Sequence, residues 1–171
     1  MFRSPMTLDS FALATTLAVG AVVVIVAISV LRGAPGLPAG VTAVVLLSVL
    51  AVTWAWSPRE LVIDDAELLV IRRAGPPLRI PLSTVAQAVA LERIGAGTVR
   101  VWGVGGFFGN YGLFRNHTLG RFRAYATRRG PVMVVRRNDG ELPIVLTPDD
   151  VDRAVSAIEQ SRGERPVPII R

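Results

Sequence analysis

The chain has 171 residues, 51% of them hydrophobic, and its 19 basic residues outnumber its 13 acidic residues for a net charge of +6. All 19 basic residues are arginine and no cysteine is present, which excludes disulfides, thiolate metal sites, catalytic thiols and a Walker lysine. The hydrophobic residues are concentrated near the N-terminus, and this concentration determines the predicted architecture.

Two long apolar stretches open the chain. Residues 11–31 carry no charge over 21 positions, and residues 37–56 carry none over 20. At about 1.5 Å per residue, each forms a helix of about 30 Å, the thickness of a bilayer hydrocarbon core. The short segment 32–36, with one Pro and two Gly, suits a tight turn. These features predict a transmembrane hairpin over residues 1–56, in preference to two buried core helices or a cleaved signal peptide.

Two spans place both termini on one side of a membrane. The turn carries Arg32 alone, whereas Arg59, Arg72 and Arg73 follow the second span closely. The positive-inside tendency therefore predicts that both termini are cytoplasmic. Trp54 and Trp56 lie where the second helix leaves the bilayer. They are predicted to be interfacial anchors, with packing against the next domain as the alternative.

Residues 57–160 are predicted to form one domain of short strands that ends in a helix. The strand signals are alternating runs separated by Gly, Pro and Asp turns. They cover residues 61–65, 67–73, 78–82, 84–92, 98–103, 120–128, 131–137 and 141–146.

The pattern changes to helical at residue 147. Thr147 is the predicted N-cap, Pro148 the first helical residue, and Asp149 and Asp150 the acids of the first turn. An apolar stripe at helical spacing follows, made of Val151, Ala154, Val155 and Ile158. Residues 161–171 are predicted to be a C-terminal tail.

These motifs resemble a known family. The runs LVIDDAELLVIRR, RIPLSTV, VRVWGVGGFFGNYGLF and FRAYATR, with the hairpin leading into LTPDD, resemble the bacterial pleckstrin-homology-like (PH-like) domains attached to paired membrane helices. The resemblance implies a protein of the bacterial cytoplasmic membrane. It also implies an α+β fold, a bent antiparallel β-barrel or sandwich of about seven strands capped by a C-terminal helix. It carries no functional residues over to this chain.

The segment 102–114, WGVGGFFGNYGLF, has three interpretations. A phosphate cradle is rejected, because such a glycine loop should open a helix. In a structural interpretation the glycines bend the sheet while side chains fill its interior, namely Val101, Val104, Phe107 and Tyr111. In the third, an exposed tip reaches a membrane or a partner through some of its aromatic rings, drawn from Phe107, Phe108, Tyr111 and Phe114.

The charge is concentrated in the second half of the domain. Nine arginines and no acid lie between Glu92 and Asp139. Anionic lipid attracts basic groups that lie near its surface. The candidate lipid or partner surface therefore adds five arginines to the aromatic tip: Arg115, Arg121, Arg123, Arg128 and Arg129. A solvated sheet face is the alternative.

The sequence offers no convergent acid, base or nucleophile, so we expect no enzyme activity, no cofactor and no metal. The lone His117 suits a surface loop. Nucleic acid is not an expected partner for a domain held so close to a membrane. The expected function is a non-catalytic binding or scaffolding module whose partner is another membrane protein or a second copy, with anionic lipid assisting. Recognition of lipid headgroups and a regulatory or accessory role beside a membrane enzyme or transporter are the alternatives.

Overall fold

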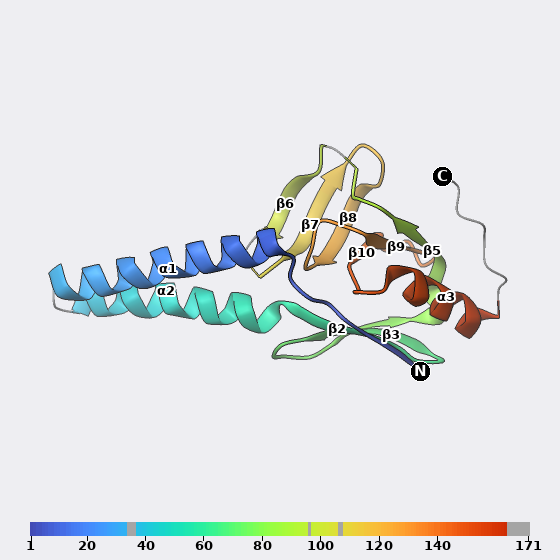
Figure 1. Ribbon diagram of the computed structural model, residues 1–171, viewed down its shortest axis with the longest axis horizontal. Coiled ribbons are helices and arrows are strands. Elements are labelled where there is room, and N and C mark those ends of the chain that lie inside the picture. Colours follow the sequence, from blue (N-terminus) through green and yellow to red (C-terminus); the bar gives the residue numbers. More distant parts are fainter. Residues whose placement is uncertain (34–36, 96, 106–107, 164–171) are drawn as a thin grey trace.

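A computed structural model describes residues 1–33, 37–95, 97–105 and 108–163. The predicted turn falls largely at residues 34–36, outside this range, as do Phe107 and the tail beyond residue 163. Two helices lie side by side and project from one end of a β-rich body (Figure 1). They are α1 (Ser10–Gly33) and α2 (Leu37–Trp56), close to the predicted boundaries. Both are long and apolar enough to cross a membrane.

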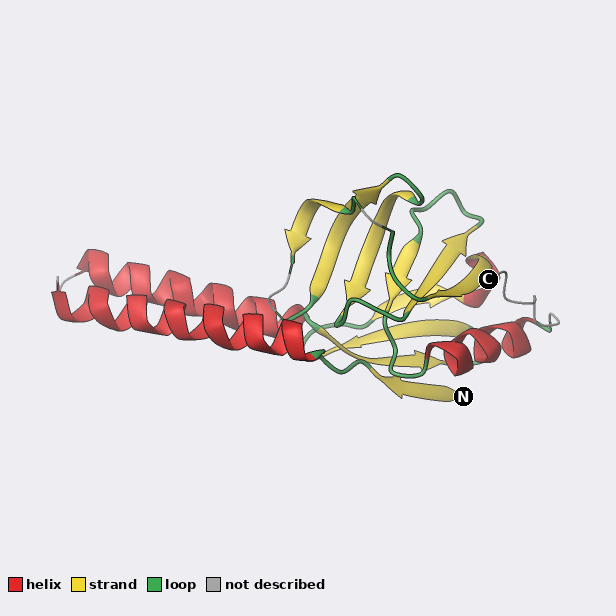
Figure 2. Ribbon diagram, turned by 45° about the horizontal axis from the view of Figure 1, so that its top comes forward, coloured by secondary structure: helices red, strands yellow, loops and turns green. Residues whose placement is uncertain are grey.

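The β-rich body contains two sheets (Figure 2). The smaller sheet has the order β1-β2-β3-β4. Its strands are β1 (Phe2–Pro5), β2 (Pro58–Ile63), β3 (Glu67–Arg72) and β4 (Leu78–Pro81). The larger sheet has the order β5-β9-β10-β8-β7-β6. A single 3-10 turn, η1 (Leu82–Thr84), leads from β4 into the larger sheet.

The strands of the larger sheet differ from the prediction in number and direction. They are β5 (Val85–Leu91), β6 (Val99–Val104), β7 (Asn110–Asn116), β8 (Gly120–Ala126), β9 (Val132–Arg137) and β10 (Ile144–Leu146). Of the predicted antiparallel barrel or sandwich, the closed barrel is not formed, because β5 and β6 remain as edge strands and two sheets pack on each other instead. The sheet is also not wholly antiparallel, since β10 runs parallel to β8. The sequence also predicted neither β1 nor β7. The α+β class and the terminal helix are as predicted.

The terminal helix α3 (Val151–Arg162) begins three residues after the predicted start. Asp150 is its N-cap and accepts a hydrogen bond from the backbone N–H of Arg153 at 3.1 Å. Thr147 is instead wholly buried, and its hydroxyl accepts from the backbone N–H of Thr127 at 2.8 Å. The predicted stripe is confirmed, since Val151, Ala154 and Ile158 are buried.

Two hydrophobic clusters lie on opposite faces of the larger sheet. The first joins the larger sheet to the smaller sheet and α3, and includes Leu61, Leu68, Met133, Ile144 and Ile158. The second lies on the other face of the larger sheet and consists of Phe114, Phe122, Ala124, Val132, Val134 and Val145. The body therefore has its own core, apart from the two long helices.

Candidate functional site: the junction between helices and sheets

The N-terminal segment is part of the β-rich body. In β1, Phe2 lies opposite Ile63 and Ser4 opposite Leu61 of β2. Just beyond β1, the backbone N–H of Met6 donates to the carbonyl of Arg59 at 2.9 Å. Residues on both sides of the helical hairpin therefore share one sheet, so the hairpin leaves the body and returns to it.

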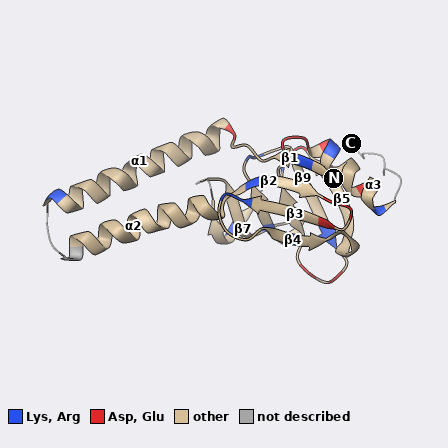
Figure 3. Cartoon of the chain, turned by 90° about the horizontal axis from the view of Figure 1, so that it is seen from below, with Lys and Arg blue, Asp and Glu red and all other residues tan. Residues whose placement is uncertain are grey.

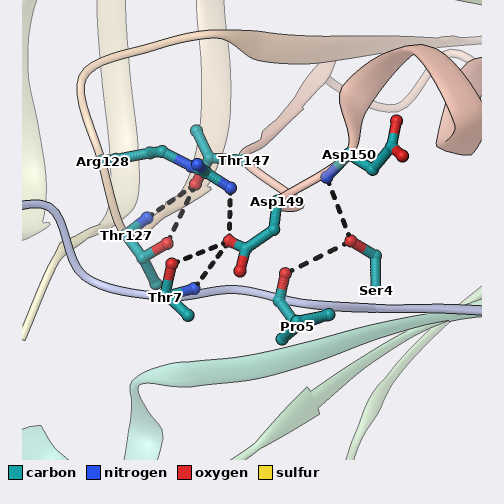
Figure 4. Close-up of polar contacts among 8 residues, drawn as sticks. All are labelled: Ser4, Pro5, Thr7, Thr127, Arg128, Thr147, Asp149 and Asp150. Atoms are coloured by element: carbon teal, nitrogen blue, oxygen red, sulfur yellow. Dashed lines mark hydrogen bonds and ion pairs between the residues drawn. The ribbon is translucent and has the colours of Figure 1, made fainter.

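Asp149 fastens this N-terminal segment to the rest of the body (Figure 4). One of its carboxylate oxygens accepts from the backbone N–H of Thr7 at 3.0 Å, from the Thr7 hydroxyl at 2.9 Å and from the guanidinium of Arg128. Its own N–H donates to the carbonyl of Pro5 at 2.9 Å, and the N–H of Asp150 donates to the Ser4 hydroxyl at 3.3 Å. Asp149 therefore acts as a connector between segments, where the sequence indicated a helix-start acid.

The start of α1 is fixed in the same way. Asp9 caps the helix by accepting from the N–H of Ala12 at 2.7 Å, while its other oxygen accepts from the N–H of Arg129 at 3.1 Å. The guanidinium carbon of Arg129 lies 3.6 Å from the ring centre of Phe11, a cation–π contact. The loop between β8 and β9 is thus held against the first turn of α1.

The strands β6 and β7 form an arm that reaches both helices. We call residues 99–105 and 108–116 the β6–β7 arm. The N–H of Phe108 donates to the hydroxyl of Thr16 in α1 at 2.8 Å, and the Tyr111 hydroxyl donates to the carbonyl of Thr53 in α2 at 2.5 Å. Phe108 has a φ of 53°, a left-handed conformation that is costly for a residue with a side chain. The contact with Thr16 holds it there.

The glycines of the arm permit a very close approach of its two strands. Gly103 and Gly112 lie opposite each other, with φ of 118° and 133°. A Cβ on Gly112 would lie 2.3 Å from the carbonyl oxygen of Trp102, so no side chain fits. This agrees with the structural interpretation of the segment.

The aromatic residues of the arm divide into buried and exposed groups. Tyr111 and Phe114 are 8% and 7% exposed, and Phe114 stacks on Phe122, so neither ring lies at an exposed tip; for Tyr111 this agrees with the structural interpretation. Burial raises the pKa of the Tyr111 phenol well above its ordinary value. Phe108 is half-buried. Val101, predicted as interior, is exposed, and the neighbouring Trp102 is 78% exposed.

The five candidate arginines do not form one surface. Arg115 and Arg121 face each other at the end of the β7–β8 hairpin that lies away from the helices, and Arg123 pairs with Glu141 at 3.6 Å. Arg128 and Arg129 lie at the start of α1. The pleat alternation was visible in the sequence, but which end of each strand meets the helices was not.

Two further arginines, which are not among the predicted site residues, lie at the junction. The guanidinium of Arg72 lies 5.0 Å from the ring centre of Trp56, and Arg73 donates to the Ser57 hydroxyl at 3.0 Å. Their position at the end of the β2–β3 hairpin that follows α2 was the available signal. Trp54 and Trp56 are both about half exposed. Figure 3 shows charged residues only near the ends of α1 and none along α2.

No metal centre is visible: across the described residues, no three His, Cys, Asp or Glu side chains gather. His117 is exposed in the loop between β7 and β8.

Comparison with known proteins gives the family. The sequence matches the family described as bacterial PH domain (bPH_5) over residues 59–162, more than half of the chain. No curated protein and no solved structure matches the chain. The matched region starts at β2 and ends with α3, so it contains both sheets except β1. The chain belongs to the bacterial PH domain family, and its PH domain follows two helices that are apolar enough to span a membrane.

Proposed function

We propose that this protein is a membrane-anchored binding or scaffolding module without catalytic activity of its own. Its PH domain is held on the cytoplasmic face of the bacterial inner membrane, and its partner is another membrane protein, with anionic lipid contact assisting. PH domains are in general binding modules. The observation that carries the proposal is the continuity of one sheet across the hairpin: β1 and β2 flank α1 and α2 in the chain and pair in the body.

The exposure of the helices supports membrane insertion. Only 17% of each apolar stretch is buried inside the molecule. A core helix of a soluble protein would bury most of its apolar surface, because exposing that surface to water costs about 25 cal/mol per Å². A bilayer removes this cost, and the lengths of about 36 and 30 Å match its hydrocarbon core.

The charge distribution supports the orientation. The body end of the hairpin carries Arg72, Arg73 and Arg129, whereas the far end carries Arg32. Basic residues next to membrane spans are retained on the cytoplasmic side. The same three arginines would lie at the level of anionic headgroups.

The fixed geometry of the junction supports a scaffolding role. Hydrogen bonds join the body to α1 through Thr16 and Asp9 and to α2 through Thr53. A domain held in this way presents the same surfaces to every neighbour in the membrane.

Recognition of lipid headgroups is the second candidate. It is favoured by Arg72 and Arg73, which form no ion pair among the described residues, and by Arg129, whose guanidinium lies over an apolar ring. An accessory role beside a membrane enzyme or transporter is a form of the first candidate, and partner identity would decide it.

Affinity purification of the full chain from membranes in mild detergent tests the proposal. At roughly 0.5 M salt, screening removes exposed charge contacts and leaves packed interfaces, so a partner membrane protein should remain in stoichiometric amount. The control is the same chain with Arg121 and Arg123 changed to Gln, which removes charge away from the helices. If the protein elutes alone and instead binds anionic but not neutral liposomes in a salt-sensitive way, headgroup recognition is the function.

A further inference from the structure

An apolar groove lies between α2 and the β6–β7 arm. It has a volume of about 540 Å³. One wall is a face of α2, made of Val44, Val45, Ser48, Val49, Val52, Thr53 and Trp56. The other wall is formed by Trp102, Val104 and Tyr111. A strand edge of the PH domain therefore faces the apolar surface of a membrane-length helix.

The arm lies level with the interior turns of the helices. Thr16, which binds the N–H of Phe108, is six residues after the first residue of α1, about 9 Å along its axis. Apolar sequence begins at Phe11, so this contact lies beyond the polar boundary marked by Asp9. If α1 enters a bilayer at Phe11, the tip of the arm enters with it. Trp102, 78% exposed, is then at a depth where indole rings are favoured.

The length of the groove suits a flexible apolar chain. Its α2 wall runs from Val44 to Trp56, about 18 Å of helix. An extended hydrocarbon chain can lie along an apolar wall of this length with its end at Trp56, and a bilayer supplies such chains beside every exposed apolar helix face. The groove therefore suits one acyl chain.

The charge at the end of the groove selects the headgroup. Trp56 forms that end, and the guanidinium of Arg72 lies over its ring at 5.0 Å. Within the described part of the chain, Arg72 pairs with no carboxylate, and its Nε has no hydrogen-bond partner. A cation next to the end of an apolar channel complements an amphiphile with an anionic head.

We propose that the groove between α2 and β6 holds one acyl chain of an anionic phospholipid, with its phosphate at Arg72, and that Trp102 is immersed in the bilayer interface. The inference rests on the proposed membrane insertion and adds to it that a strand edge of the PH domain is submerged. The lipid then forms part of the contact between the domain and the helices.

The three tryptophans provide the test, because Trp54 and Trp56 lie on α2 and Trp102 on β6. The full chain is reconstituted in nanodiscs that contain phospholipid with a nitroxide near the headgroup. Two single-tryptophan variants are compared: Trp54→Phe/Trp56→Phe, which keeps Trp102, and Trp56→Phe/Trp102→Phe, which keeps Trp54. Quenching by nitroxide lipid and by aqueous iodide is measured for each.

The expected result is that Trp102 is quenched by nitroxide lipid as strongly as Trp54 and is shielded from iodide. If iodide quenches Trp102 while lipid quenches Trp54, the domain stands clear of the bilayer and the inference is wrong, although the membrane hairpin remains. If Trp102 is shielded from both agents, protein fills the groove and the inference is equally wrong. If lipid quenches neither tryptophan, membrane insertion itself fails, and the proposed function fails with it.

A second measurement tests the headgroup. Nitroxide on phosphatidylglycerol should populate the groove about five-fold more than nitroxide on phosphatidylcholine, the ratio expected for one arginine at an anionic surface. Arg72→Gln should abolish this preference while Trp102 remains quenched. Arg121→Gln, which removes a charge at the other end of the sheet, should preserve it. Equal quenching by the two lipids in the unchanged protein would overturn the assignment of the phosphate to Arg72.

Discussion

The hydroxyl of Tyr111 donates to the carbonyl oxygen of Thr53 over 2.5 Å, which joins strand β7 to the last turn of helix α2. Thr53 also uses its own hydroxyl to bind the carbonyl of Val49, so its side chain is satisfied within the helix. Removal of the Tyr111 hydroxyl therefore leaves the Thr53 carbonyl without this partner. We expect Tyr111→Phe to lower the free energy of unfolding by about 1 kcal/mol. Denaturant titration in mild detergent measures it, and Tyr125→Phe, a half-buried tyrosine in β8, is the matched control. An equal loss in both variants would argue against this contact.

The same residue predicts a pH effect. Burial raises the pKa of Tyr111, so the folded protein holds the phenolic proton more tightly than the unfolded chain does. The resulting stability is complete below the unfolded pKa of about 10 and is lost as the pH rises above it. We expect the stability of the unchanged protein to fall more steeply above pH ~10 than that of Tyr111→Phe. Parallel pH profiles of the two unfolding midpoints would contradict the burial of this phenol.

The contacts of Asp149 lead to a prediction about how the N-terminal segment is held. Asp149→Asn removes the charge that faces Arg128 and weakens the bonds from Thr7, a loss of about 2 kcal/mol for charge-assisted hydrogen bonds. Hydrogen exchange should then accelerate at the amides of Met6 and Thr7, which are protected in the unchanged protein. Asp152→Asn changes an exposed acid in the first turn of α3 and should leave these amides protected. Unchanged protection in Asp149→Asn would show that β1 pairing alone fixes the segment.

The glycine pair of the arm predicts a large difference between two apparently similar substitutions. Gly112→Ala places a Cβ 2.3 Å from a backbone oxygen at a φ of 133°, so β6 must separate from β7. Gly140→Ala also has a positive φ, 79°, but its Cβ meets open space, so only the backbone cost of about 1 kcal/mol applies. Trp102 fluorescence should shift strongly in the first variant and remain unchanged in the second. Similar spectra in both would mean that the strands do not approach this closely.

The sequence alone predicts the three helices, but it does not predict the strands β1 and β7. The helices α1 and α2 are defined by uninterrupted apolar composition, and α3 by the stripe of Val151, Ala154 and Ile158, which are local signals. The strand β1, with sequence FRSP, has no alternation of its own. It exists because it pairs with β2 across the 52 intervening residues of hairpin and flanking chain, from 6 to 57. Such a pairing has no local signal.

The sequence predicted only part of the candidate site, because strand register, which has no local signal, decides which of its residues meet. The exposed Trp102 and the buried Phe114 belong to the same glycine-rich segment, and only the register between β6 and β7 assigns them to opposite environments. The grouping of Arg72 with Trp56 depends on a hairpin that returns to the end of α2. Residues that meet through strand register are separated in sequence by the intervening strands, so composition alone did not group them.

The central claim is that the hairpin crosses a membrane and that the whole PH domain, including β1, lies on its cytoplasmic side. The absence of cysteine allows single-cysteine labelling of the full chain in intact cells with a membrane-impermeant maleimide. Arg32→Cys, at the far end of α1, should be labelled in intact cells. Thr118→Cys, in the exposed β7–β8 loop, should be labelled only after lysis. Labelling of Thr118→Cys in intact cells, or recovery of the protein in the soluble fraction, would contradict the account.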